Sequence, residues 1–205
     1  WIRNSVDDAV RIYRQLVSQG VVSPENLTLF HSRFAFYDRQ RIESQTLELF
    51  GKQSAAQRRG KVIIATQVIE QSLDIDLDEM ISDLAPVDLL IQRAGRLQRH
   101  IRYRNGRVKT SGQDERDSPA LLILAPEWDD SPQENWLSSV MRNSAYVYPD
   151  HGRLWLTQRV LRQQGEIRMP QSARRLIESV YGEDVEMPEG FAKTEQQQEG
   201  KFYCD

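Results

Sequence analysis

The sequence predicts an α/β fold with a mostly parallel sheet flanked by helices, followed by a C-terminal helical extension. Short apolar segments, above all residues 61–66 and 120–125, run without polar alternation, as is typical of strands covered on both faces. Segments with helical periodicity separate them, and parallel strands need such crossovers. After Pro126 only helical patterns follow. We therefore expect a sheet domain at residues 1–127 and a helical extension with a polar tail at residues 128–205.

The first quarter of the chain predicts a helix, a strand and a second helix. Residues 1–3 are too short for a strand, and Asn4 or Ser5 can cap the helix that follows and that Gly20 ends. Residues 27–30 read as a short strand, and residues 38–50 read as a helix closed by Gly51. The first helix has an apolar stripe at Val6, Ala9, Val10, Tyr13, Leu16 and Val17.

The remaining elements follow in the same way. Residues 52–60 predict a loop before the strand at 61–66, and residues 79–84 predict another strand. Pro86 suits a first helical position, so a short helix begins there and ends at Gly95. A further buried strand is expected at 120–125. The extension predicts helices near 133–148, 153–164 and 171–181.

Composition describes an ordinary globular chain, with 39% hydrophobic and 28% charged residues and a net charge of −3. No apolar run approaches the roughly 20 residues that a membrane-spanning helix needs, so we expect no membrane partner. No secretory pattern opens the sequence, and the expected compartment is the cytoplasm. Cys204 is the one cysteine, which excludes an internal disulfide.

Charge is unevenly distributed, because residues 89–113 contain no Asp or Glu. The loop at 102–109 is either a surface that follows phosphates or a solvated hairpin, and the lack of a nearby carboxylate in sequence favours the first. The basic residues of this strip are Arg93, Arg96, Arg99, Arg102, Arg104, Arg107 and Lys109.

Within the strip, the segment QRAGRLQRH places Arg96 and Arg99 one helical turn apart, after Gln92. A fixed guanidinium that faces a transferred phosphoryl group accelerates its transfer by about three to five powers of ten. The alternative is a solvated basic end of a helix, where cations are favourable in any case.

A second candidate lies where the strand at 61–66 ends in Thr66, within the segment ATQVIEQSLDID. A hydroxyl and free backbone N–H groups at the carboxyl end of a parallel strand can bind an anion. Alternatively, Thr66 and Asp74 satisfy local backbone groups in a simple turn.

Together, ATQVIEQSLDID and QRAGRLQRH resemble motifs V and VI of superfamily 2 helicases, in the right order and separation. The amino-acid sequences of these two segments are most similar to the type I CRISPR-associated helicase-nuclease family. Asn4-Ser5-Val6, His31-Ser32-Arg33-Phe34 and the segment ARRLIESVYGEDVEMPE also resemble that family. The resemblance implies a RecA-like second motor lobe, with ATP as cofactor.

The resemblance also implies roles for single residues. Arg96 and Arg99 would be arginine fingers, and Gln92 would read the terminal phosphate. Ser72 and Asp74 would lie near the ribose and the interlobe cleft. Contacts to nucleic-acid phosphates would come from Ser5, Ser32, Arg33, Thr66 and Gln67. Gln98 departs from the glycine that many superfamily 2 proteins carry, which puts the local turn in question.

The 205 residues lack a G-x-x-x-x-G-K-[ST] loop and a paired acidic motif for magnesium. His31, His100 and His151 are not spaced as metal ligands, so no metal site is expected. The resemblance therefore implies that a separate N-terminal lobe holds ATP and magnesium. It also implies that the present chain is inactive on its own. Implied partners are single-stranded DNA, that lobe, a nuclease domain of the same protein and a CRISPR RNA-guided surveillance complex. Alternatives are another DNA or RNA helicase of the superfamily, or a non-catalytic nucleic-acid-binding module.

Overall fold

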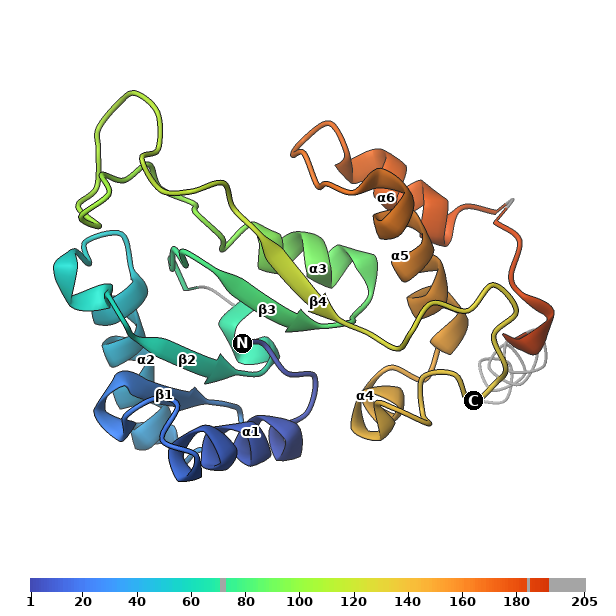
Figure 1. The fold of residues 1–205 in the computed structure, drawn as a ribbon, viewed down its shortest axis with the longest axis horizontal. Helices are drawn as coiled ribbons and strands as arrows, with labels where there is room; N and C mark the ends of the chain where they lie inside the picture. The colour runs from blue at the N-terminus through green and yellow to red at the C-terminus, as the bar shows by residue number, and fades with distance from the viewer. Residues whose placement is uncertain (71–72, 184, 192–205) are drawn as a thin grey trace. The chain divides into compact units, whose positions relative to one another are not determined.

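The computed structural model describes residues 1–70, 73–183 and 185–191, and the chain divides into two compact units (Figure 1). The first unit combines Trp1–Asp83 with Gln92–Ile123. The second combines Leu84–Ile91 with the described residues from Leu124 onward. The domain boundary expected after residue 127 stays a prediction.

The sheet of the first unit contains a parallel pair of strands and a second strand pair. Strands β1 (Leu27–Phe30) and β2 (Val62–Ala65) pair in parallel, with Leu27 opposite Val62 and Phe30 opposite Ala65. Strand β3 (Met80–Asp83) pairs with β4 (Leu121–Leu124). These pairings confirm the predicted α/β fold class.

The N-terminal segment connects the two strand pairs. Ile2 forms parallel bridges to Ala65 on one side and to Ser82 on the other. The backbone N–H of Arg3 donates to the Ala65 carbonyl at 2.8 Å, and that of Ile2 donates to the Ile81 carbonyl at 2.8 Å. The segment is too short to form a strand of its own, as expected, yet it occupies a strand position because both edges supply hydrogen-bond partners.

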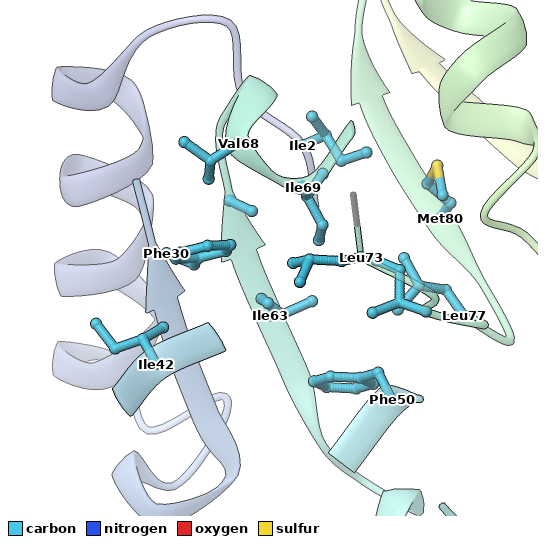
Figure 2. Packing of buried hydrophobic residues seen from close by; sticks show 12 residues of the cluster. Ile2, Phe30, Ile42, Phe50, Ile63, Val68, Ile69, Leu73, Leu77 and Met80 are labelled. Atoms are coloured by element: carbon cyan, nitrogen blue, oxygen red, sulfur yellow. The ribbon is translucent and has the colours of Figure 1, made fainter. Parts of the chain in front are cut away.

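Helices cover both faces of this sheet. Helix α1 (Val6–Ser18) begins at the cap residue Ser5 and packs Ala9 against Ile64 and Leu27. Helix α2 (Phe36–Phe50) starts two residues before the expected position and packs on the other side, where Ile63 points (Figure 2). Neighbouring residues of β2 thus enter opposite clusters, which explains the absence of polar alternation in this strand.

The larger apolar cluster contains side chains from α2, β1, β2, β3 and the segments between them (Figure 2). Burying each large apolar side chain contributes about 1.5 to 3 kcal/mol relative to leaving it exposed. This cluster therefore holds the ends of the strands, and the loops that follow them, in place. Its main members are Ile2, Phe30, Ile42, Phe50, Ile63, Ile69, Leu73, Ile75, Leu77 and Met80.

One strand differs from expectation in its burial. Strand β4 was predicted to be buried, but Leu122 is 62% exposed and Leu124 is 43% exposed. Leu121 packs against the larger cluster, so β4 is covered on one face only. The prediction was wrong because a continuous apolar run does not distinguish a strand covered on both faces from one at the edge of a sheet.

The second unit is helical, and no strand follows Leu124 in its described part. It contains α4 (Arg142–Val147), α5 (His151–Gln164) and α6 (Ala173–Tyr181), and the first five residues of α3 (Val87–Ala94). The helix expected at 133–148 is helical only at its end, so that prediction was wrong for residues 133–141. Within the described residues, no helix is both long and apolar enough to cross a lipid bilayer.

Candidate functional site

The candidate nucleic-acid residues lie on segments that meet at the carboxyl edge of the sheet. Ser5 follows the N-terminal segment, Ser32 and Arg33 follow β1, and Thr66 and Gln67 follow β2. Because these three segments run parallel, their carboxyl ends share one edge. Gln67 Nε2 donates to the Asn4 carbonyl at 2.8 Å, which joins two of the segments directly.

Two of these side chains already have partners on α1. The Ser5 hydroxyl accepts from the backbone N–H of Asp8 at 3.1 Å and donates to the Asp8 carboxylate at 2.8 Å. Arg33 Nη1 lies 2.7 Å from Asp7 Oδ1, but both side chains are more than 60% exposed, so this ion pair is weak. Ser32 is exposed, whereas Thr66 is buried. Arg33 and Ser32 are therefore the accessible members of the set.

The loop after β1 is ordered by a histidine. His31 stacks on Phe34 with ring centroids 4.2 Å apart, and its Nδ1 accepts from the backbone N–H of Arg33 at 3.2 Å. Burial lowers the pKa of His31, and the positive charge of Arg33 adds to this effect. A neutral imidazole is thus favoured, and it positions the loop that carries Ser32 and Arg33.

The candidate ATP residues form a second group. Arg96 Nη2 donates to the Glu70 carbonyl at 3.1 Å, whereas its Nε is buried without a hydrogen-bond partner among the residues that the structure describes. Burial lowers the pKa of Arg96, and the neighbouring Arg99 lowers it further. An unsatisfied buried N–H costs about 1 to 3 kcal/mol, so an anionic oxygen that accepted this hydrogen bond would be stabilising. The donor set therefore fits a phosphate.

Arg99 and Asp74 form an ion pair that the sequence analysis did not predict. Arg99 Nη1 lies 3.4 Å from Asp74 Oδ1, and His100 Nε2 lies 3.2 Å from the same oxygen. Gln92 is exposed on α3, and its side chain has no hydrogen-bond partner among the described residues. Ser72 lies outside the described residues. No three His, Cys, Asp or Glu side chains within residues 1–70, 73–183 and 185–191 could hold a metal ion.

Arg93 links the candidate nucleic-acid residues to the candidate ATP residues. The sequence analysis counted it in the basic strip and did not predict that it is buried. The side chain is completely buried. Its Nε donates to the Glu70 carboxylate at 2.7 Å, and its Nη1 donates to Ser82 Oγ at 2.7 Å and to Asn4 Oδ1 at 3.3 Å. The spacing along the helix could have indicated this burial. Arg93 follows the fully buried Leu90 by three residues and therefore lies on the same face of α3.

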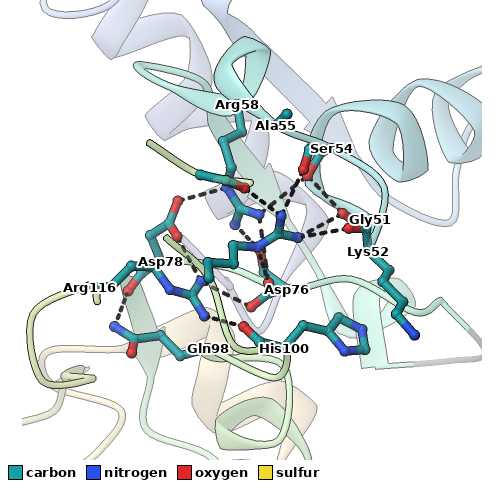
Figure 3. A network of polar contacts seen from close by, with 12 residues as sticks. Gly51, Lys52, Ser54, Ala55, Arg58, Asp76, Asp78, Gln98, His100 and Arg116 are labelled. Atoms are coloured by element: carbon teal, nitrogen blue, oxygen red, sulfur yellow. Dashed lines mark hydrogen bonds and ion pairs between the residues drawn. The ribbon is translucent and has the colours of Figure 1, made fainter. Parts of the chain in front are cut away.

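A second buried network corrects the expectation for the loop at 102–109 (Figure 3). Arg102 is fully buried and donates to the Asp76 carboxylate and, at 2.7 Å, to the Ser54 carbonyl. Lys109 pairs with Glu115 at 2.9 Å. The prediction of a phosphate-tracking surface was wrong for these two residues, because Asp76, distant in sequence, and Glu115, just beyond the basic strip, neutralise them. Arg104 and Arg107 remain exposed.

The same network contains residues that sequence reasoning did not single out. Asp76 is fully buried, with Arg58 Nη1 at 3.6 Å and Arg116 Nη1 at 3.2 Å from its carboxylate. Both arginines also contact Asp78, at 2.9 and 2.8 Å (Figure 3). Asp76 therefore stabilises three guanidinium groups and holds the loops next to the candidate ATP residues.

Gln98 adopts the backbone conformation that a glycine would favour. Its φ of 46° is the one left-handed value of a non-glycine residue in the described part of the chain. The backbone N–H donates to the Leu77 carbonyl at 2.8 Å, and the side-chain amide donates to the Asp117 carbonyl at 2.8 Å. The turn is thus retained without glycine.

We expect Gln98→Gly to change the local free energy of unfolding by less than about 1 kcal/mol. Relief of left-handed strain, about 1 to 2 kcal/mol, offsets the lost side-chain hydrogen bond and the greater entropy of an unfolded glycine. Gln98→Val should destabilise the turn by about 2 kcal/mol, because a β-branched residue disfavours positive φ. Hydrogen exchange of the amides around Leu77 would measure both variants, and a glycine variant less stable than the valine variant would contradict this account.

Comparison with known proteins places this geometry in a family. The family model described as CRISPR-associated nuclease/helicase Cas3, C-terminal, matches residues 1–102. The Escherichia coli (strain K12) CRISPR-associated endonuclease/helicase Cas3 is 32% identical over 190 residues, which are 92% of this chain and 19% of that protein. The Thermus thermophilus protein of the same name is 39% identical over 164 residues, 79% of this chain and 16% of that protein. The chain thus spans less than a fifth of the length of these relatives.

Solved structures agree with the sequence comparison. The crystal structure of T. fusca Cas3-AMPPNP matches with a TM-score of 0.77 and 34% identity, covering 98% of this chain and 22% of that chain. A structure described as a CRISPR RNA-guided surveillance complex, pre-nicking, matches with a TM-score of 0.71 and 34% identity, covering 98% of this chain and 23% of that chain. These similarities confirm the predicted RecA-like α/β fold. The chain therefore belongs to the Cas3 family of CRISPR-associated nuclease/helicases, as a part of the C-terminal region.

Proposed function

We propose that this chain is the second motor lobe of an ATP-dependent helicase that translocates on single-stranded DNA and unwinds target DNA for degradation in CRISPR interference. The observation that carries the proposal is the grouping of Arg96, Arg99 and Asp74, with the Nε of Arg96 buried and without a partner among the described residues. A lobe that only bound nucleic acid would not need two arginines and an aspartate grouped in this way.

On the ATP side, Arg96 and Arg99 would stabilise the negative charge that develops on the transferred phosphoryl group. Gln92 would contact the terminal phosphate, and Asp74 and Ser72 would lie near the ribose. Bound ATP, with its magnesium ion, supplies the phosphoryl group that is transferred to water. A separate N-terminal lobe would hold the metal and cradle the phosphates, because this sequence has no phosphate-binding loop.

On the DNA side, Ser32 and Arg33 would contact backbone phosphates at the carboxyl edge of the sheet. Ser5, Thr66 and Gln67 would complete this edge, Thr66 through its position at the end of β2. Contacts of this kind hold a strand regardless of its sequence, as translocation requires.

A chain of buried and partly buried hydrogen bonds connects the two sides. Glu70 accepts a hydrogen bond from Arg96 through its carbonyl and from Arg93 through its carboxylate. Arg93 in turn reaches Asn4, whose carbonyl accepts from Gln67. This connection supports the coupling of DNA binding to ATP hydrolysis. A shift of the residues on the DNA side changes hydrogen bonds that the residues on the ATP side share, and the reverse also holds.

The experiment that tests the proposal compares nucleic acids as activators of the full-length protein. Single-stranded DNA should stimulate ATP hydrolysis, and displacement of a labelled strand should require ATP. Equal or greater stimulation by RNA would favour an RNA helicase of the same superfamily. DNA binding without any ATP-dependent activity would overturn the proposal in favour of a non-catalytic binding module.

Recruitment by a surveillance complex belongs to the same proposal. One structural neighbour is a CRISPR RNA-guided surveillance complex, which supports this class of partner. The test is co-purification of the full-length protein with a target-bound complex. Loss of unwinding when the complex is omitted from a duplex substrate would agree with recruitment, and equal unwinding without it would contradict it.

We expect Arg33→Gln in the full-length protein to weaken single-stranded DNA binding. The slope of log Kd against log salt should fall by about 0.7, the value for one phosphate contact to a single strand. Arg41→Gln is a matched control, since Arg33 and Arg41 are both 65% exposed and each pairs with a nearby aspartate. Fluorescence anisotropy at several salt concentrations measures both. Equal effects of the two substitutions would show that only total charge matters.

A further inference from the structure

The second unit contains a cavity of about 520 Å³ that no part of the proposed mechanism uses. It is lined by Trp128, Asp130, Arg159, Arg162 and Gln163. The volume falls within the roughly 300 to 1,000 Å³ of typical ligand sites. Aromatic and cationic side chains thus converge on one open space, and their chemistry limits what it can hold.

The aromatic part of the site is rigid. Trp128 stacks on Trp155, with ring centroids 4.8 Å apart and an angle of 23° between the rings. Trp155 is only 5% exposed, and its Nε1 donates to the Asp129 carbonyl at 2.8 Å. Because Trp155 is anchored in the core of the unit, it fixes the position of Trp128 at the cavity.

The two arginines lie against these rings. Arg159 lies over Trp155, 5.2 Å from the ring centroid, and Arg162 lies over Trp128 at 5.4 Å. They are three residues apart on α5, so they share a face of the helix. Neither has a carboxylate partner among the described residues.

This arrangement leaves the arginines ready for an anion. A cation–π contact with an indole ring does not consume the N–H groups of a guanidinium, which can still donate hydrogen bonds to a phosphate. The contact also restricts the side chain before binding, which lowers the entropic cost of holding a ligand. Arg168 and Arg174 of the same unit differ, because they pair with glutamates at 3.0 and 2.6 Å.

We propose that this cavity is an additional binding site for single-stranded DNA, in which Arg159 and Arg162 hold a backbone phosphate and Trp128 contacts the neighbouring base. Indole and guanidinium groups together are the combination that binds single strands without sequence preference. Asp130 already accepts from Trp128 Nε1 at 2.9 Å, and its free oxygen can accept from a base amino group.

The proposal depends on the proposed function only in its choice of DNA as the ligand. Its test is the double variant Arg159→Gln/Arg162→Gln in the full-length protein, measured by anisotropy with a labelled oligonucleotide. We expect affinity to fall by about tenfold, as for the loss of one charge-assisted hydrogen bond or more. The slope of log Kd against log salt should fall by about 1.4, the value for two contacts to a single strand.

The matched control is Arg168→Gln/Arg174→Gln, which removes the same charge from the same unit at ion-paired positions. The control should leave affinity and slope nearly unchanged, and both variants should keep the basal ATP hydrolysis measured without DNA. Equal losses in both variants, or none in either, would overturn the site.

Three outcomes separate the possible explanations. Unchanged DNA affinity together with weaker association with the surveillance complex would overturn DNA as the ligand and identify a protein surface. If the unmodified full-length protein binds no single-stranded DNA, the proposed function itself fails. If that protein binds DNA and the pocket variant binds it equally well, only the additional site is refuted.

Discussion

Arg96→Ala is expected to lower the DNA-stimulated kcat for ATP hydrolysis by the full-length protein about 10³- to 10⁵-fold, the range for loss of an arginine finger. Arg96 lies next to Arg99 with a buried Nε donor that has no partner in the described part of the chain, so its strongest interaction would form only with a phosphate oxygen. Interactions that strengthen in the transition state raise kcat more than they raise substrate affinity. Binding of a non-hydrolysable ATP analogue should therefore be largely retained.

The measurement compares steady-state ATP turnover with analogue binding in the same preparation. Arg96→Lys separates charge from geometry, because an ammonium keeps the charge but loses the planar fork, and most of the activity should still be lost. Arg41→Ala removes an exposed arginine of the same unit and should leave turnover unchanged. Wild-type turnover in Arg96→Ala would refute the assignment of this residue to the ATP site.

Asp76→Asn is expected to lower the local free energy of unfolding by about 3 to 5 kcal/mol, as when one partner of a buried ion pair is removed. Asp76 is fully buried and is shared by Arg58, Arg102 and Arg116. Asparagine keeps the shape but removes the negative charge. Arg102 would then be a fully buried cation with only carbonyl groups as partners.

Hydrogen exchange of amides in the segments around Ser54 and Arg102 would measure this loss without assuming that a multidomain protein unfolds in one step. Asp78→Asn is the control, because Asp78 contacts two of the same arginines but its side chain is 45% exposed. An exposed ion pair is worth at most about 1 kcal/mol, so the control should have a much smaller effect. Equal protection in Asp76→Asn and the unmodified protein would contradict a stabilising role for this network.

Much of the first unit follows from local sequence rules. Ser5 caps α1 because its hydroxyl accepts from the backbone N–H of Asp8, as the capping pattern predicted. The apolar run at residues 61–66 forms β2, and Ile63 and Ile64 enter clusters on opposite sides of the sheet. Hydrogen bonding within a helix and the two-residue period of a strand depend on neighbouring residues, so a single sequence suffices to predict them.

Part of the geometry of the candidate site follows for a similar reason. Parallel strands carry their carboxyl ends to one edge, so the segments that contain Arg33 and Gln67 meet there, whereas the resemblance alone named these residues and their roles stay predictions. The pairing of Asp74 with Arg99 was not predicted, because 25 positions in the sequence separate them and no local rule joins them.

Burial of charged residues could not be predicted in this way. The charged side chains of the basic strip at 89–113 are all positive. Arg93 and Arg102 are nevertheless completely buried, and they pair with Glu70 and Asp76. A buried cation is stable only where a carboxylate and carbonyl groups converge on it. Those partners come from loops 23 or more positions away, so the packing of the chain decides which arginines are structural.

The sequence by itself determined the α/β class, the order of strands and helices, the helix caps and the spacing of Gln92, Arg96 and Arg99, since all of these depend on residues close together in the chain. Tertiary structure alone decided that β4 is covered on one face, that Gln98 replaces glycine in a left-handed turn, and that Arg162 lies over Trp128 with no ion-pair partner among the described residues. In each of these cases the outcome is set by atoms that folding brings together, and no local pattern specifies which atoms those are.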